Sequence, residues 1–187
     1  DEIINYYSEQ CELIVGVDKG CNYLFDAKVK PNYIVGDFDS SNLEIIDEMV
    51  KQGVVKYQYQ CEKNFTDSEE AFELAISKNA KKITFLGQRF DHTLGNLGLL
   101  LKALNVGIYS EIVDDRNKMF LINKNTVVKR ENEYKYISFL AYNNTVEEFS
   151  IKGAKYNLDK YTLEIGDSRT VSNEFITEEI SLEISNG

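Results

Sequence analysis

The stretch Tyr33–Ser40 reads Y-I-V-G-D-F-D-S and is the most informative segment of the chain. A short apolar run ends at Gly36 and is followed at once by Asp37 and Asp39. This order is typical of a buried strand that ends at the carboxyl edge of an α/β sheet, where such sheets bind ligands. Two carboxylates so close together repel unless a cation lies between them, and a divalent cation also brings phosphate oxygens. The stretch therefore predicts a metal-dependent site for a phosphate ligand.

The D-x-D spacing alone is weak, because a chain with 12 Asp residues contains such a pair by chance. The flanking residues make it more specific. Pro31 precedes the strand, Gly36 permits a tight turn, and 40–42 (S-S-N) can cap the next helix. The alternative interpretation is a solvated acidic turn on an acidic protein. Taken by itself, the segment leaves both interpretations open.

Composition limits the classes of partner. The chain has 187 residues, a net charge of −10 and a calculated pI near 4.7. An excess of negative charge argues against a nucleic acid or an anionic membrane as a partner. It suits a cationic substrate, or simply solubility.

The predicted location is the cytoplasm. Cys11, Cys21 and Cys61 are odd in number and form no C-x-x-C pair, which fits a reducing compartment and gives no zinc site. The first residues lack the pattern of a signal peptide. The longest apolar stretch, 97–104, is too short to span a bilayer.

The pattern changes near residue 120, which predicts two domains, 1–120 and 121–187. In the first, apolar strands alternate with helical stripes, which predicts a mostly parallel, Rossmann-like α/β domain. In the second the helical period disappears, and short strands separated by turns predict an antiparallel β-sandwich. The expected strands are 13–17, 33–35, 54–57, 83–86 and 108–113, then 126–129, 134–141, 145–151, 161–165, 168–172 and 178–184.

Polar clusters follow four of the strands expected in the first domain, at 17–20, 36–40, 63–67 and 87–92. The carboxyl ends of parallel strands meet at one edge of a sheet, so these clusters are expected to lie together. The third cluster also has a structural explanation. Thr66 can be a helix N-cap and Glu69 the residue that bonds back to it, with Asp67 favouring the helix dipole.

The fourth cluster contains Arg89, Asp91 and His92. The guanidinium of Arg89 suits phosphate oxygens, although a surface pair with Asp91 is the alternative. His92 is the only histidine, and a lone histidine at a helix start is more often a hydrogen-bonded structural residue than a catalyst. Its neighbours favour a role in ligand binding rather than in acid catalysis. The sequence has neither G-x-x-x-x-G-K-[ST] nor G-x-G-x-x-G, so a phosphate would be held by metal, side chains and helix ends.

Taken in order, these motifs resemble the thiamine pyrophosphokinase family, from about residue 13 to the C-terminus. Together they are specific, although singly none is. The motifs that carry the resemblance are Asp18-Lys19-Gly20, Pro31 to Ser40, Lys63 to Asp67, Arg89 to His92 with Asn96, Gly153 to Leu158, and Ser172-Asn173-Glu174.

The resemblance implies transfer of pyrophosphate from ATP to thiamine with Mg²⁺, releasing AMP, by a homodimer with shared active sites. It implies Asp37, Asp39 and Asp67 as catalytic and metal-binding residues. It implies Ser172 and Asn173 as thiamine-binding residues contributed across the dimer. The residues it implies for nucleotide binding are Asp18, Ser40, Thr66, Arg89, Asp91, His92 and Asn96.

Three departures from the family pattern keep alternatives open. Asn64 stands where an Asp is usual, the turn 87–89 is short, and the first strand of the family seems to be missing before residue 1. One alternative is a nucleotide- or thiamine-binding protein without turnover. The other is a metal-dependent D-x-D glycosyl- or nucleotidyltransferase, which normally needs a longer nucleotide-binding stretch before its acids than the 36 residues that precede Asp37.

Overall fold

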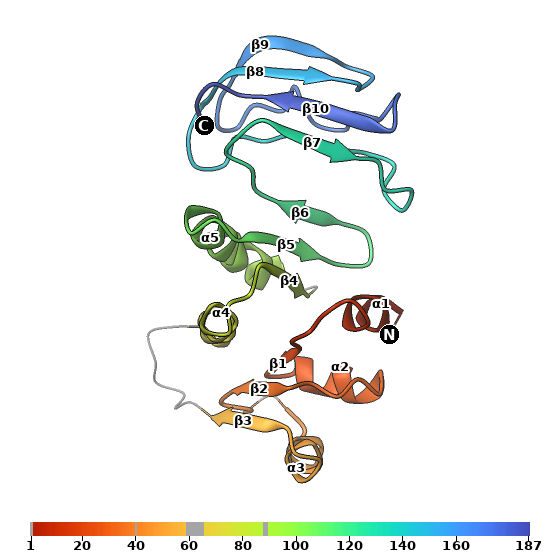
Figure 1. The fold of residues 1–187 in the computed structure, drawn as a ribbon, viewed down its shortest axis with the longest axis vertical. Helices are drawn as coiled ribbons and strands as arrows, with labels where there is room; N and C mark the ends of the chain where they lie inside the picture. Colours follow the sequence, from red (N-terminus) through yellow and green to blue (C-terminus); the bar gives the residue numbers. More distant parts are fainter. Residues whose placement is uncertain (1, 40, 59–65, 88–89) are drawn as a thin grey trace. The chain divides into compact units, whose positions relative to one another are not determined.

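The computed structural model describes residues 2–39, 41–58, 66–87 and 90–187, and the chain divides into two compact units (Figure 1). Unit 1 is Asp1–Phe120 and unit 2 is Leu121–Gly187. The boundary coincides with the change of sequence pattern near residue 120. Within the described residues, no helix combines the length and the apolar character that a membrane span needs.

Unit 1 alternates helices with short strands. Its elements are α1 (Glu2–Ser8), β1 (Val15–Val17), α2 (Gly20–Asp26), β2 (Tyr33–Gly36), α3 (Leu43–Lys51), β3 (Val55–Gln58), α4 (Asp67–Ser77), β4 (Lys82–Leu86), α5 (Phe90–Asn105), β5 (Tyr109–Val113) and β6 (Lys118–Phe120). All five strands expected in this half are formed, within a residue or two of the expected bounds.

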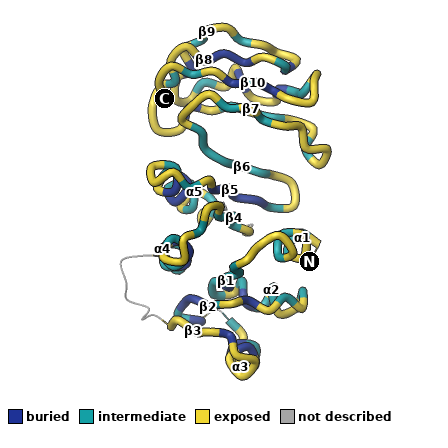
Figure 2. The backbone as a smooth tube through the Cα atoms, in the orientation of Figure 1, coloured by how far each residue is buried: buried dark blue, intermediate teal, exposed yellow. Residues whose placement is uncertain are grey.

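The first sheet has the order β1-β2-β3 and is entirely parallel. Its central strand is the apolar run before the D-x-D turn, and Ile34 and Val35 are fully buried there. Figure 2 shows this buried stretch in dark blue. Ile34 packs with Ile46 and Met49 of α3 in one core cluster. The apolar side chains spaced along α3 thus pack against β2 and hold the turn that follows it in place.

Helix α3 begins where its N-cap requires. The side chain of Asn42 accepts a hydrogen bond from the backbone N–H of Glu44 at 3.0 Å. This satisfies one of the amide groups that have no partner within the first helical turn. The cap expected at 40–42 is confirmed at Asn42, whereas Ser40 lies outside the described residues.

The second sheet has the order β4-β5-β6, with β5 parallel to β4 and antiparallel to β6. Phe72 of α4 packs with Leu99 and Ala103 of α5 against one face of this sheet. We expected one mostly parallel sheet, and the described strands instead form two ladders of three. Helix α4 lies against β1 and β2 and connects the first sheet to the α4–α5 layer through packing rather than through strand pairing.

Unit 2, all of which is described, contains one four-stranded antiparallel sheet of order β7-β10-β8-β9. The strands are β7 (Thr126–Lys129), β8 (Val146–Lys152), β9 (Leu158–Leu163) and β10 (Glu179–Glu183). One face carries the core of the unit, whose buried members are Ala141, Phe149, Ile151, Ala154, Leu163, Ile180 and Leu182.

Two strands expected in unit 2, 134–141 and 168–172, are not formed. The first segment forms one isolated bridge, between Ile137 and Asn173, and the N–H of Phe139 donates to the carbonyl of Thr170 at 3.2 Å. Between these backbone bonds, hydroxyl side chains bond to backbone groups, since Ser138 Oγ accepts from the N–H of Ser172 at 3.0 Å. Thr170 Oγ1 likewise donates to the carbonyl of Phe139. Local side-chain bonds of this kind compete with strand pairing, so the second layer of a sandwich is not built from regular strands.

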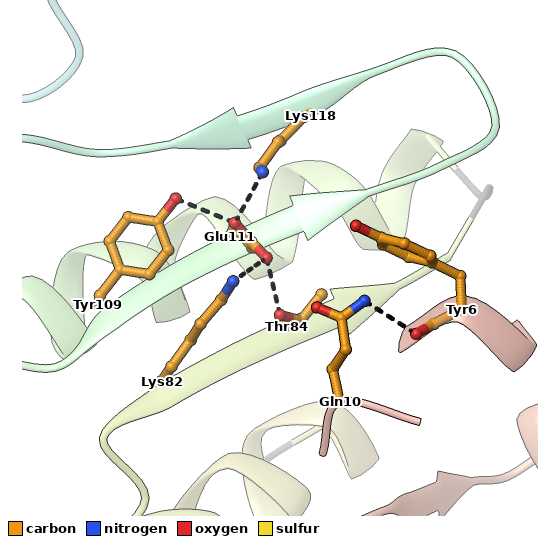
Figure 3. A network of polar contacts seen from close by, with 7 residues as sticks. All are labelled: Tyr6, Gln10, Lys82, Thr84, Tyr109, Glu111 and Lys118. Carbon is orange, nitrogen blue, oxygen red and sulfur yellow. Dashed lines mark hydrogen bonds and ion pairs between the residues drawn. The ribbon is translucent and has the colours of Figure 1, made fainter. Parts of the chain in front are cut away.

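A buried carboxylate on β5 ties the second sheet of unit 1 together (Figure 3). Glu111 has no exposed side-chain surface and accepts from Thr84 Oγ1 and Tyr109 OH, both at 2.9 Å. The ammonium groups of Lys82 and Lys118 lie 2.8 and 3.5 Å from its two oxygens. Burial alone would raise the pKa of Glu111, but these partners hold that pKa below its ordinary value. The network joins β4, β5 and β6.

We predict that Glu111→Gln lowers the free energy of unfolding at neutral pH by about 1.5–3 kcal/mol, the range for hydrogen bonds to a charged group. A carboxyl whose pKa is lowered by folding stabilises the chain above its ordinary value of 4.5 and loses that contribution as pH falls. The difference between the variant and the parent should therefore shrink in chemical denaturation below about pH 4.

The matched control is Glu183→Gln, which breaks a pair with Lys152 in which both side chains are more than half exposed. Its effect should be small, because exposed ion pairs contribute little. Equal losses in the two variants, or a Glu111→Gln deficit that does not depend on pH, would contradict the role of the network.

Candidate active site

The D-x-D turn is anchored by the residue between its two acids. Phe38 is 1% exposed, packs in the same core cluster as Ile34, and has a positive φ of 63°. The Asp37 carboxylate accepts from the N–H of Asp39 at 3.0 Å, which closes a turn beside the buried ring. Asp37 is half-buried and Asp39 is exposed. The apolar residue therefore fixes two carboxylates at the end of β2.

Asp18 at the end of β1 meets this turn. Its backbone N–H donates to the carbonyl of Val35 at 3.0 Å. Its carboxylate accepts from the N–H of Phe38 at 3.4 Å. The carboxylate of Asp18 can lie this close to the turn because residue 36 is a glycine. A Cβ atom at Gly36 would lie 1.9 Å from Asp18 Oδ1. Gly36 also has a φ of 148°, which disfavours any other residue.

Asp67, the first residue of α4, completes the cluster of carboxyls. Burial is the main cause that raises the pKa of Asp18 to about 7. A hydrogen bond with Asp67 and the negative charges of Asp67 and Asp37 raise it further. Two carboxyls share a hydrogen bond only when one of them keeps a proton. The expected convergence of the first three polar clusters is thus observed for Asp18, Asp37 and Asp67.

These carboxyls suit a hard divalent cation. Mg²⁺ prefers oxygen ligands, and a bound cation would relieve the repulsion from Asp67 and Asp37 that contributes to the raised pKa of Asp18. In the described part of the chain, no three His, Cys, Asp or Glu side chains already form a group that could hold a metal ion. The assignment of Asp37, Asp39 and Asp67 as the metal ligands stays a prediction.

Thr66 has the structural role expected of it. Its side chain accepts from the N–H of Glu69 at 3.2 Å and caps α4. The carboxylate of Glu69, which was expected to bond back to Thr66, instead pairs with Lys102 of α5. The capping box is therefore half formed. The cap places Asp67 in the first turn of the helix, so the structural and the functional interpretations of this segment are compatible.

The expected nucleotide-binding residues of the fourth cluster begin helix α5. Asp91 and His92 are exposed in its first turn, and Asn96 follows one turn later, four residues after His92. The turn before them leaves the end of β4, where the N–H of Gly87 donates to the carbonyl of Val113 at 3.4 Å. Arg89 and Asn64 lie outside the described residues.

In unit 2 the two residues expected at thiamine differ in character. Ser172 is exposed and has a positive φ of 59°. Asn173 is 2% exposed, and its amide group is used within its own chain. Ser172 is thus accessible for direct contact with a ligand, whereas the side chain of Asn173 stabilises the conformation of its loop.

Sequence reasoning missed Lys56 at the D-x-D turn. Its ammonium nitrogen lies 5.0 Å from the centroid of the Phe38 ring, so a cation is held beside the residue that separates the two acids. A lysine inside β3 carries no motif, and the pairing of Ile34 with Lys56 in the sheet is what brings it there. Only the strand register could have revealed it.

Comparison with known proteins accounts for both units. The family description "Thiamin pyrophosphokinase, catalytic domain" matches residues 4–111, and "Thiamin pyrophosphokinase, vitamin B1 binding domain" matches residues 124–187. The chain belongs to the thiamin pyrophosphokinase family. Its relatives include thiamine pyrophosphokinase of Bacillus subtilis (strain 168), which is 34% identical over 91% of this chain and 81% of its own length.

Solved structures of the family share the fold. The crystal structure of thiamine pyrophosphokinase from Bacillus subtilis has a TM-score of 0.86 at 29% identity, covering 94% of this chain and 84% of that one. Thiamin pyrophosphokinase from Candida albicans has a TM-score of 0.80 at 18% identity, covering 95% and 81%, and supports the fold alone. The α/β fold with mixed sheets is thus that of the thiamin pyrophosphokinase family.

We predict that Gly36→Ala displaces Asp18 from the D-x-D turn, because the added methyl group would overlap its carboxylate. The backbone conformation adds strain, so the variant should be less stable by roughly 1–3 kcal/mol. Turnover should fall by more than the loss of folded protein explains. Gly20→Ala is the control, since a Cβ at Gly20 meets nothing within 4 Å. Equal thermal stability and activity of the two variants would show that the close approach is unimportant.

Proposed function

We propose that this chain transfers the pyrophosphoryl group of ATP to the hydroxyl group of thiamine, giving thiamine diphosphate and AMP. The observation that carries the proposal is the pair of consecutive family matches, which together span both units. The acidic cluster at the ends of β1 and β2, facing the start of α4, supports it independently. That edge is where parallel sheets bind their ligands.

The proposed reaction needs alignment and neutralisation of charge more than covalent help. Asp37, Asp39 and Asp67 would hold Mg²⁺, which when bound would neutralise charge on the transferred phosphates. Asp18 keeps these groups in register through its hydrogen bonds to the turn and to Asp67. The buried side chain of Phe38 fixes the positions of the two acids on either side of it in the sequence.

The first turn of α5 is proposed to contact the nucleotide. A helix N-terminus presents backbone N–H groups that favour an anion. Asp91, His92 and Asn96 lie on the first two turns of this helix. Arg89 precedes them and would add a guanidinium fork for phosphate oxygens. We keep a cytoplasmic location as part of this proposal, since three cysteines without a paired motif fit a reducing compartment.

The first prediction from this proposal is the product pair. The full chain with Mg²⁺, ATP and thiamine should release AMP and form thiamine diphosphate in equal amounts, measured by chromatography. Chelation of the divalent cation should abolish both. Formation of ADP with thiamine monophosphate would contradict pyrophosphoryl transfer. Tight binding of thiamine and ATP without product would instead favour the alternative of a binding protein that lacks turnover.

The active sites are proposed to be shared between two copies of the chain in a homodimer. We predict that Asp39→Asn, which removes a metal ligand, and Ser172→Trp, which fills an exposed position of unit 2, each inactivate the chain. Mixed after subunit exchange, the two should regain about a quarter of wild-type activity if heterodimers are half of the population and carry one intact site.

The control for this experiment is each variant mixed with itself. Exchange is followed with chains that carry different affinity tags, and the assembly state is measured by analytical ultracentrifugation. A monomeric chain, or no recovery despite proven exchange, would exclude shared sites while leaving the activity of the parent chain unaffected.

A further inference from the structure

The aromatic residue between the two D-x-D acids lies near the open edge of the first sheet. Strand β3 is the last strand in the order β1-β2-β3, and no described strand pairs with its outer edge. Phe38 follows the neighbouring strand β2, and its ring belongs to the core cluster that also contains Ile46 and Met49 of α3. The backbone of Phe38 has a φ of 63°, a left-handed conformation that bulky residues rarely adopt. Burial of the ring therefore has to offset this strain.

Lys56 of β3 lies over this ring. It pairs with Ile34 of β2, so the two side chains are on the same face of the sheet. Val54, two residues earlier and 4% exposed, belongs to the same core cluster as Ile34 and Phe38. The half-buried side chain of Lys56 continues this apolar row and ends with its ammonium nitrogen 5.0 Å from the centroid of the Phe38 ring. An apolar residue would cover the row equally well, so the charge needs an explanation of its own.

The positive charge of Lys56 has no carboxylate partner in the part of the chain that the structure describes. Its ammonium group is placed against the Phe38 ring instead. Asp37 and Asp39 directly flank Phe38 in the sequence, on a chain whose net charge is −10. A half-buried charge is screened less than an exposed one, so the field of Lys56 acts on the acidic turn. The lysine is thus an electrostatic component of the D-x-D turn.

We propose that Lys56 adapts the acidic cluster to a metal–nucleotide complex rather than to a bare metal ion. The inference rests on the proposed function and adds to it a residue that is not among the assigned ligands. ATP carries several negative charges, of which a bound Mg²⁺ offsets only a part. Carboxylates that attract the metal also repel the rest of the triphosphate. A fixed cation beside the turn weakens the attraction for free Mg²⁺ and offsets the repulsion of the phosphates.

These two effects have opposite signs, which separates them from a purely structural role. If Lys56 only covered the Phe38 ring, its loss would loosen the turn and weaken the binding of both ligands. Removal of its charge alone should strengthen the binding of a cation and weaken that of an anionic complex. Lys56→Met keeps most of the apolar stem and removes the charge. Lys56→Arg keeps a cation over the ring and should bind both ligands like the parent.

The test measures two dissociation constants of the full chain. One is for Mn²⁺ alone, which stands in for Mg²⁺ and is followed by electron paramagnetic resonance. The other is for a non-hydrolysable ATP analogue with equimolar Mg²⁺, measured by calorimetry. For Lys56→Met the first should fall and the second should rise, each by roughly 2- to 5-fold, as expected for one unit charge acting on a divalent species through a largely aqueous medium. Both differences should shrink at high salt.

Lys78→Met is the matched control. The ammonium nitrogen of Lys78 lies 5.3 Å from the centroid of the Tyr33 ring, at the start of β2 rather than beyond its end. The variant removes the same kind of contact and changes the net charge of the chain by the same amount. Both of its dissociation constants should match those of the parent. If Lys56→Met is unstable, Lys56→Gln removes the charge with a different side chain and is measured in its place.

Weaker binding of both ligands by Lys56→Met would show that the lysine only holds the ring, and it would overturn the inference. Unchanged binding of both, or equal changes in Lys78→Met, would overturn it as well. In each of these cases a parent chain that converts thiamine and ATP leaves the proposed function standing. If the parent binds neither Mn²⁺ nor the nucleotide analogue, the proposed function fails together with the inference.

Discussion

The structure of unit 1 depends on how its acids are held together at the edge of the first sheet. The carboxylate of Asp18 approaches the backbone at Gly36 and accepts from Phe38, so the ends of β1 and β2 are joined through an acidic side chain. Asp67 arrives at the same place on the capped end of α4. Like charges repel, and the arrangement persists because the burial of Phe38 and the cap at Thr66 place these residues independently of their charges.

This independence links the core to the proposed chemistry. The cluster of Ile34, Phe38 and Ile46 stabilises the turn through apolar burial, which does not change when a cation or a phosphate group binds. Under the proposed function, the acids would be held close together before a ligand arrives. A site that is preorganised in this way would not have to reorganise its dipoles during the reaction, and preorganisation is a main source of electrostatic catalysis.

The sequence predicted the parts of the fold that local pattern determines. Strand β2 could be predicted from its apolar run, the start of α3 from the capping residues at 40–42, the start of α4 from Thr66, and the unit boundary from the loss of the helical period. The separation of the strands of unit 1 into two ladders and the irregular segments 134–141 and 168–172 could not be predicted. Their alternating residues look like strands, and only the tertiary placement of Ser138 and Thr170 shows hydroxyl groups bonding to backbone in place of a ladder.

The same limit applies to the candidate site. Asp37 and Asp67 were accessible from sequence because each follows a strand or begins a helix, and the structure brings both of them to Asp18. The pair Ser172-Asn173 was equally visible as a motif, but a motif does not say which of its polar residues faces a ligand and which one anchors the loop. Burial decides this, because a buried amide is committed to backbone partners, whereas its exposed neighbours remain available. In this loop the exposed neighbour is Ser172, so the residue of the pair that is available for a contact is Ser172 rather than Asn173.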